Sequence, residues 1–99
     1  MVVMVENDVG GRVRVRNSGI VGIVNTRITN NSLIVRASDV VVVKDNNVKE
    51  GSIRIIGNIN ATVTRNDAER NIVCRDNGEL TSLFNDADDG ENNCDLFGR

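Results

Sequence analysis

The fold is indicated by the stretch DVVVVKDNNVKEGSIRIIGNI, residues 39–59, whose layout returns about every twenty residues in both directions. Three short apolar segments follow one another in it, namely Val40–Val43, Val48 and Ile53–Ile56. Asp, Asn, Lys, Glu, Gly and Ser separate them. Val and Ile favour extended backbone because their branched Cβ packs well on a pleated surface. The stretch therefore predicts three short strands within one repeating unit.

Apolar residues recur at the same places in the neighbouring units, which is the mark of a repeat architecture. Two columns have a constant step of twenty residues: Val3, Ile23, Val43, Val63 and Leu83; and Met1, Val21, Val41, Ala61 and Thr81. Three further columns contain one step of nineteen residues: Val9, Ile28, Val48 and Ala68; Val13, Leu33, Ile53 and Ile72; and Val15, Val35, Ile55 and Cys74. Such columns predict coils that stack one strand spacing apart, about 4.8 Å.

We therefore predict an all-β fold, a single-stranded parallel β-solenoid with about twenty residues and three short strands per coil and four to five coils. One domain would span residues 1–99, with the coils over 1–85 and an acidic C-terminal tail or cap over 86–99. The alternative is an antiparallel sandwich, which also has a strand roughly every 8–12 residues. A sandwich would not require one residue class to recur at a step of about twenty, and the solenoid is favoured for that reason.

Three segments resemble the coils of the right-handed parallel β-helix family, the pectate-lyase-like proteins with parallel β-helix repeats. They are VVVVKDNNV at 40–48, ATVTRNDA at 61–68 and, more loosely, VGIVNTRI at 21–28. The resemblance covers about residues 2–85 and implies a right-handed coil. Members of the family include lyases, hydrolases, epimerases, adhesins and phage tail parts, so the resemblance implies a fold and no particular activity.

The composition argues against several classes of partner and chemistry. The net charge of −2 predicts no binding to nucleic acid, and no apolar run is long enough for insertion in a membrane. Histidine is absent, which removes the commonest metal ligand and the usual acid–base group at neutral pH. No residue matches the calcium-binding acids and the basic residue that lyases of the family use. We therefore predict no catalytic residue, no metal and no cofactor, and a protein that is not an enzyme.

The acidic end of the chain is a further candidate for metal binding. Hard cations prefer several oxygen ligands, but the spacing of these acids does not fit a calcium-binding loop. A solvated loop is therefore the favoured interpretation for the acids, which are Asp86, Asp88, Asp89, Glu91 and Asp95. Asp39, Asp45 and Asp67 are expected at the corners of coils and apart from one another.

Cys74 and Cys94 lie twenty residues apart, which is one coil. If both occupy one column, their Cα atoms fall inside the window of roughly 4.4–6.8 Å that a disulfide requires. We predict this disulfide, which would pin the acidic tail to the last coil and stabilise the fold by about 3 kcal/mol. Two buried thiols are the alternative. A disulfide implies an oxidising setting, so the predicted location is extracellular or at the cell surface.

Arginines alternate with the inward residues of the third strand of each coil, and alternation along a strand places them on the outer face. The guanidinium group suits carboxylates, sulfates and phosphates, so this basic strip is a candidate site for an acidic polysaccharide or for the acidic tail of a neighbouring copy. A solvated face is the alternative. No aromatic residue lies between the arginines, which argues against single-stranded nucleic acid. The basic strip comprises Arg14, Arg16, Arg36, Arg54 and Arg75.

The N-terminal stretch MVVMVENDV has the pattern of a strand with no amphipathic helix in front of it. The ends of a solenoid are strand edges that need covering, so we predict a self-association edge at Val2, Val3, Met4 and Val5. At the other end, Leu96 and Phe97 are expected to fold back as a lid.

These features predict a non-catalytic structural protein that self-assembles through its N-terminal edge into a filament or a closed oligomer. The alternative function is an extracellular module that binds an acidic polysaccharide, such as an adhesin. A remnant of a polysaccharide lyase ranks last.

Overall fold

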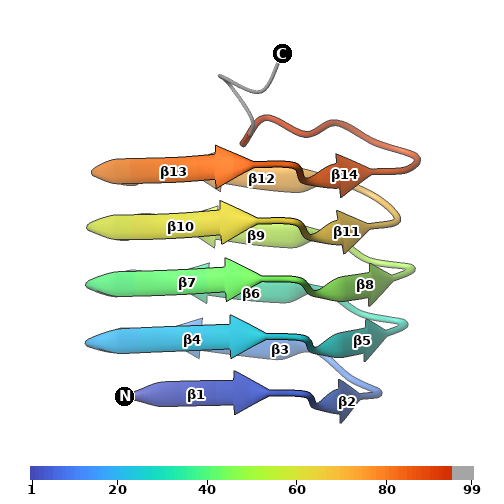
Figure 1. Cartoon of the computed structure of the whole chain (residues 1–99), viewed down its shortest axis with the longest axis horizontal. Coiled ribbons are helices and arrows are strands. Elements are labelled where there is room, and N and C mark those ends of the chain that lie inside the picture. Colours follow the sequence, from blue (N-terminus) through green and yellow to red (C-terminus); the bar gives the residue numbers. More distant parts are fainter. Residues whose placement is uncertain (95–99) are drawn as a thin grey trace.

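The computed structural model is a right-handed parallel β-helix, in which every strand pairs in parallel with strands of the turns next to it (Figure 1). It describes residues 1–94, and within them the chain forms strands and turns but no helix. These residues complete four turns and begin a fifth. The predicted fold class is confirmed. None of the described residues belongs to a helix long and apolar enough to cross a membrane.

Each complete turn contributes one strand to each of three sheets (Figure 1). The first sheet contains β1 (Val2–Val5), β4 (Ile20–Val24), β7 (Val40–Lys44), β10 (Asn60–Thr64) and β13 (Glu79–Leu83). The second sheet contains β2 (Asp8–Val9), β5 (Arg27–Thr29), β8 (Asn47–Lys49), β11 (Asp67–Ala68) and β14 (Asp86–Ala87). The third sheet contains β3 (Val13–Arg16), β6 (Leu33–Arg36), β9 (Ile53–Ile56) and β12 (Ile72–Arg75).

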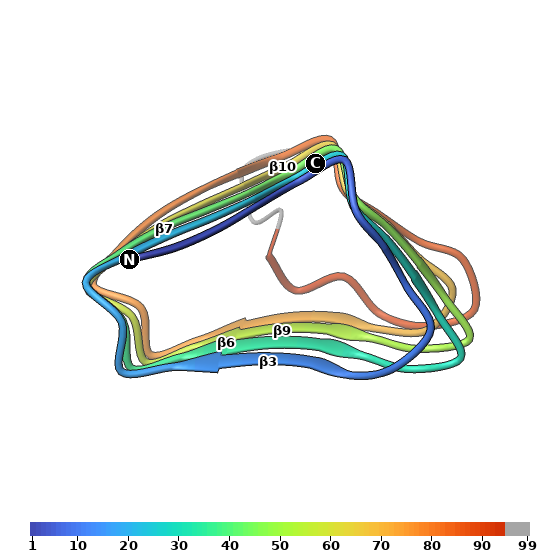
Figure 2. The ribbon, with the colours of Figure 1, turned by 90° about the horizontal axis from the view of Figure 1, so that it is seen from below.

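The core runs along the axis of a three-sided cross-section (Figure 2). Alternate side chains of each strand point inward, and the same column position is filled in successive turns, as Ile28, Val48 and Ala68 are in the second sheet. All three are at most 1% exposed. Burial of a Val or Ile side chain contributes roughly 1.5–3 kcal/mol, so these columns supply most of the favourable energy of folding.

The predicted register is confirmed in the second and third sheets. In the first sheet it is correct in the middle turns and wrong at both ends. Ile23, Val43 and Val63 stack as expected, but Ile23 lies above Met4 and Val63 lies below Ser82. The first and last steps of this column are therefore nineteen residues. A slip of one residue turns every side chain of a strand to the other face. As a result Val3, which was expected in the core, is 61% exposed. In the predicted column that contains Val21 and Ala61, Val2 takes the place of Met1 and Leu80 takes the place of Thr81.

Asparagine side chains stack inside the corner that follows the first sheet. The Oδ1 atom of Asn46 accepts a hydrogen bond from the backbone N–H of Thr26 at 2.8 Å. Its Nδ2 group donates to the carbonyl of Ile23 and to Oδ1 of Asn66, both at 2.9 Å. Asn66 repeats the pattern one turn later with Asn85. We call Thr26, Asn46, Asn66 and Asn85 the amide ladder.

Similar stacks occupy the other two corners. Ser18, Ser38, Asn58 and Asn77 connect the third sheet to the first. Ser32, Ser52 and Asn71 connect the second sheet to the third. Tight corners leave backbone donors without a partner in the sheets, and these side chains accept from them. Among the described residues, every buried side-chain nitrogen and oxygen atom has a hydrogen-bond partner.

The backbone of the corner turns in the residue before the amide ladder. Asn25, Asp45 and Arg65 have φ values of 52°, 57° and 52°, in the left-handed region. Asparagine tolerates this region, and asparagine was among the polar residues expected to separate the strands. In the structure the left-handed residue comes first, and the residues that follow it, Asn46 and Asn66, face the core.

The winding continues beyond residue 85, where the coils were expected to end. Strand β14 pairs with β11, and Asn92 forms a bridge with Ile72 of β12, so residues 86–92 form part of a fifth turn. The expected lid residues, Leu96 and Phe97, lie outside the described part of the chain.

Candidate functional site

Within the described part of the chain, the first turn presents three strand edges. β1, β2 and β3 each pair with a strand of the second turn and occupy the last place in their sheets (Figure 1). Edge strands present N–H and C=O groups to which another strand can bind. All four residues of the predicted self-association edge, Val2, Val3, Met4 and Val5, lie on one of these strands, β1.

The direction of the free groups on β1 follows from its last hydrogen bond. The N–H of Glu6 donates to the carbonyl of Val24, 3.0 Å away, in the strand above. Because successive N–H groups along a strand point to opposite sides, the amides of Val3 and Val5 point away from β4. These two residues therefore present the backbone groups that a further strand would meet.

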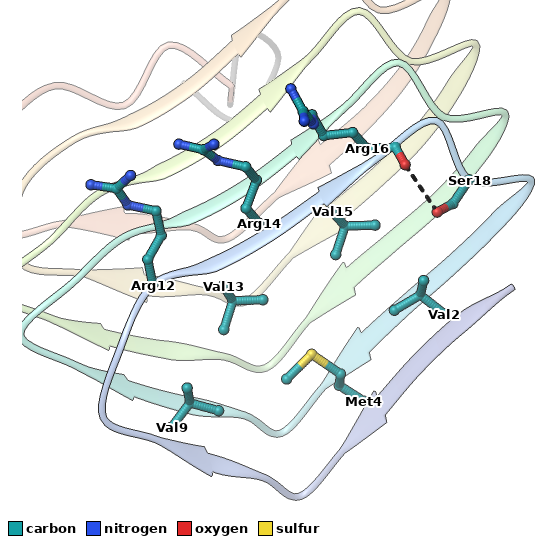
Figure 3. A pocket seen from close by; sticks show the side chains of 9 residues that line it. All are labelled: Val2, Met4, Val9, Arg12, Val13, Arg14, Val15, Arg16 and Ser18. Carbon is teal, nitrogen blue, oxygen red and sulfur yellow. Dashed lines mark hydrogen bonds between the residues drawn. The ribbon is translucent and has the colours of Figure 1, made fainter.

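Apolar side chains of the first turn surround a hollow of about 470 Å³ between these edges (Figure 3). Its floor is formed by residues that occupy the core columns, and one layer higher their equivalents, Val21, Ile23 and Ile28, are completely buried. Arg12, Arg14 and Arg16 lie along the rim on β3 and just before it (Figure 3). The floor consists of Val2, Met4, Val9, Val13 and Val15.

We call this apolar floor and the three strand edges around it the N-terminal face. The sequence predicted only its β1 part. Val9, Val13 and Val15 were recognised as core residues, and the overlooked signal was that each is the first member of its column. A first member has no layer below it among the described residues.

The structure gathers the five arginines of the predicted basic strip on the outer face of the third sheet. Arg16 and Arg36 are direct neighbours on β3 and β6. Ile34 lies between Arg14 and Arg54, and Ile56 lies beside Arg75. All five arginines are exposed, and none pairs with a carboxylate of the described residues. The strip is therefore a basic surface interrupted by apolar side chains.

Three carboxylates meet on the outer face of the second sheet. Asp67 and Asp86 are neighbours on β11 and β14, and oxygen atoms of both lie within 4.8 Å of one another and of Asp88. Burial raises the pKa of Asp67, and the charges of Asp88, Asp86 and Glu69 raise it further. The sequence predicted Asp67 at a corner, apart from Asp39 and Asp45, and did not reveal that Asp86, nineteen residues later, is its neighbour.

This pKa shift predicts how Asp67 affects stability. The folded state binds the proton of Asp67 more readily than the unfolded state does, so the group favours folding as the pH falls and opposes it at neutral pH. Asp67→Asn should therefore raise the free energy of unfolding at pH 7 by about 0.2–1 kcal/mol, the size of a like-charge pair across strands. It should also weaken the gain in stability on acidification.

Urea unfolding at neutral and mildly acidic pH measures this effect. Asp39→Asn, which removes another exposed carboxylate, is the control and should change stability less. If Asp67→Asn instead destabilises the protein at pH 7, the three carboxylates are held by an attractive interaction and the expected repulsion is wrong.

The structure joins Cys74 and Cys94 in the predicted disulfide, with Cα atoms 5.0 Å apart. Cys94 is 2% exposed and lies one turn above Cys74, where the chain beyond β14 turns inward (Figure 2). The bond ties the partial fifth turn to the fourth. Disulfides are typical of oxidising compartments, in agreement with the predicted extracellular location.

No family model, no curated protein and no solved structure matches this chain. Its candidate sites are therefore defined by their geometry, and the principal one is the N-terminal face of a parallel β-solenoid.

Proposed function

We propose that this protein is a structural, non-catalytic solenoid that self-assembles through its N-terminal face. The observation that carries the proposal is the combination of three strand edges with an apolar floor in one surface. The second turn shows what a further layer does to such a surface, because Val21 and Ile23 have no exposed area there. A second molecule on the N-terminal face would bury Val2 and Met4 in the same way.

Backbone pairing adds to this apolar contact. The edge strand β1 can bind a strand of another molecule through its free N–H and C=O groups. Pairing of an edge strand with another chain is a common route to assembly. The apolar floor supplies affinity, and the alternation of inward and outward side chains sets the register. Both contributions come from one end of the molecule.

Analytical ultracentrifugation over a range of protein concentrations tests the proposal. The protein should form larger species as its concentration rises. Met4→Lys should lower the association constant at least tenfold, because an unpaired ammonium group would be buried in the contact. Ile59→Lys is the matched control, since Ile59 is an exposed apolar residue between the third and first sheets, away from the N-terminal face.

Circular dichroism and thermal unfolding would show that both variants keep the fold, with the stem of the lysine covering the floor as methionine does. A wild-type protein that stays monomeric at every accessible concentration would refute self-assembly. Equal association by Met4→Lys and the wild type would place the contact elsewhere.

A second candidate function is binding of an acidic polysaccharide by the basic strip. It is supported by five exposed guanidinium groups on one sheet that have no carboxylate partner among the described residues. Charge reversal of Arg36 and Arg54 should abolish binding to polygalacturonate or heparin. Arg27→Glu, an exposed arginine on the second sheet, is the control and should retain most of the affinity.

Kinship with the pectate-lyase-like family is also a proposal, supported by the right-handed parallel coil. It would make a lyase remnant the third candidate, which predicts calcium-dependent release of unsaturated sugar from pectin-like substrates.

A further inference from the structure

We infer that the outer face of the first sheet docks with the same face of a second copy, with the two solenoids side by side and antiparallel. This contact is separate from the N-terminal face and goes beyond the proposed function. Its twofold axis runs along the strand direction between the two sheets, so the same surface of both copies takes part. The sheets would pack face to face at about 10 Å.

The outer face of the first sheet is apolar in the first three turns. Its outward residues lie side by side in the parallel register of β1, β4 and β7. They are Val3 and Val5, Ile20 and Val24, and Val40 and Val42, with Gly22 in the middle and Lys44 at one edge. Four of these side chains are 43–61% exposed. We call this surface the apolar panel.

The outer faces of the other two sheets carry charges instead. The third sheet carries the basic strip, and the second presents Asp8, Arg27 and Lys49 in its first three turns. Strand spacing and rise give the apolar panel roughly 15 Å in both directions. Single apolar side chains are normal on a surface, whereas a contiguous patch of this extent marks an interaction site. In the fourth turn Thr62 and Thr64 take the outward positions and form its border.

The centre of the panel contains a hollow that a second copy would fill. Gly22 lies between Val3 and Val42 in the outward column, and a Cβ atom added to it would have no neighbour within 4 Å. In the antiparallel arrangement the second turn of one copy faces the third turn of the other, so Val42 of each copy stands over Gly22 of the other. A large side chain over a small one lets layers pack without voids. Parallel solenoids would set Gly22 on Gly22 and leave the hollow empty.

The distribution of charge along the axis favours the same arrangement. Residues 1–38 contain five arginines and two acids, whereas residues 66–94 contain two arginines and eight acids. Parallel copies would set like charges beside each other. Antiparallel copies set the basic half of one beside the acidic half of the other, and such complementarity guides encounter and fixes orientation.

One ion pair across the contact can be named. Glu6 and Arg65 occupy the same corner, after the first sheet, in the first and fourth turns. When the second turn faces the third, the first turn faces the fourth, so Glu6 of each copy lies opposite Arg65 of the other. Both residues are exposed. Arg65 is held at this corner by Asp45, with its Nε atom 2.9 Å from the carboxylate.

A reciprocal exchange of sizes provides the decisive test. Gly22→Val fills the hollow, and it should lower the dimerisation constant about tenfold although it adds apolar surface. Val42→Gly should lower it as well, because it removes the side chain that fills the partner's hollow. Gly22→Val combined with Val42→Gly again sets a large residue over a small one and should recover most of the association. Sedimentation equilibrium measures all three, with Met4→Lys in every protein so that the N-terminal face does not contribute.

The fold of these variants is checked by circular dichroism and thermal unfolding. Gly22 has no positive φ and lies within β4, where valine suits the strand. Thr81→Val is the control, since it adds apolar surface to the same sheet in the fifth turn, outside the panel, and should leave dimerisation unchanged.

A charge swap supplies the second arm. Glu6→Arg and Arg65→Glu should each lower the dimerisation constant by up to about fivefold, and the double variant should recover most of it. Arg27→Glu, an exposed arginine on the second sheet, is the control for a change of net charge.

Failure of this inference is distinguishable from failure of the proposed function. A Met4→Lys protein that stays monomeric at every accessible concentration overturns docking of the apolar panel, whether or not the wild type associates. A Gly22→Val variant that associates equally or more strongly overturns the antiparallel arrangement, since a hollow without an occupant gains from being filled. Loss in both single variants with recovery in the double variant supports it.

Discussion

Asn66→Ala should cost about 3–5 kcal/mol of unfolding free energy, as the largest effect of a single substitution expected in this protein. The Oδ1 atom of Asn66 accepts from the backbone N–H of Asn46 at 3.0 Å and from its side chain at 2.9 Å. The Nδ2 group donates to the carbonyl of Val43 and to Oδ1 of Asn85, both at 2.9 Å. Alanine would remove the hydrogen bonds that these buried groups make with the Asn66 side chain, and each buried group that loses its partner costs roughly 1–3 kcal/mol.

The estimate lies below the simple total because water can enter the corner and because the effects within one hydrogen-bond network are not additive. Urea unfolding followed by circular dichroism measures the change. Asn60→Ala is the matched control, since Asn60 lies in the same turn but is exposed, and its effect should stay within about 0.5 kcal/mol.

Equal stability of Asn66→Ala and Asn60→Ala would show that the amide ladder contributes nothing net. Asn66→Asp tests the ladder in another way, because it keeps the shape but replaces the donating amide by a buried charge. It should be at least as destabilising as alanine at neutral pH.

Loss of the disulfide should have the second largest effect. Cys74→Ala combined with Cys94→Ala should lower the free energy of unfolding by about 3 kcal/mol, the value expected for a loop of this length. The bond closes a segment with a sequence separation of 20 residues. It restricts the unfolded chain and, in the folded state, it holds the partial fifth turn against β12.

The effect should be local as well as global. Hydrogen exchange should accelerate at the amides of Asp88 and Asn93, which donate to carbonyls of the fourth turn. The amide of Arg27, which donates to Asn7 at the other end, serves as the internal control. Unchanged stability and unchanged exchange after reduction would show that the fifth turn is held by its strand pairing alone.

The parallel coil could be predicted from the sequence because one residue class fills each column. Ile28, Val48 and Ala68 are so regularly spaced that the sequence favours a repeating turn over a sandwich. The register at the ends of the first sheet could not be predicted in the same way. Val3 and Met4 are both apolar, and a step of nineteen or twenty residues fits the pattern equally well. Burial decides between them, and burial is a property of the packed turn.

The basic strip and the cysteine pair were also within reach of sequence reasoning. Arg36 and Arg54 face outward by simple alternation along a strand, and Cys74 and Cys94 are one period apart. The amide ladder was not, because asparagine is equally common in exposed turns. Only the fold shows that Asn46 and Asn66 lie inside their corners.

The N-terminal face was recognised in part. Its apolar floor takes residues from three strands, and Val9 and Val13 come from strands that the sequence did not assign to an edge. Arg12 was missed because it precedes its strand.

The corner side chains have a consequence for the history of the gene. The side-chain amides of Asn46 and Asn66 bond to the turn below and to the turn above, so one turn carries the groups that the next one needs to dock. Duplication or deletion of a DNA segment that encodes one complete turn would leave every joint intact, whereas an insertion of any other length would put the wrong residues at the joints. Related proteins are therefore expected to differ in length by whole turns of the solenoid.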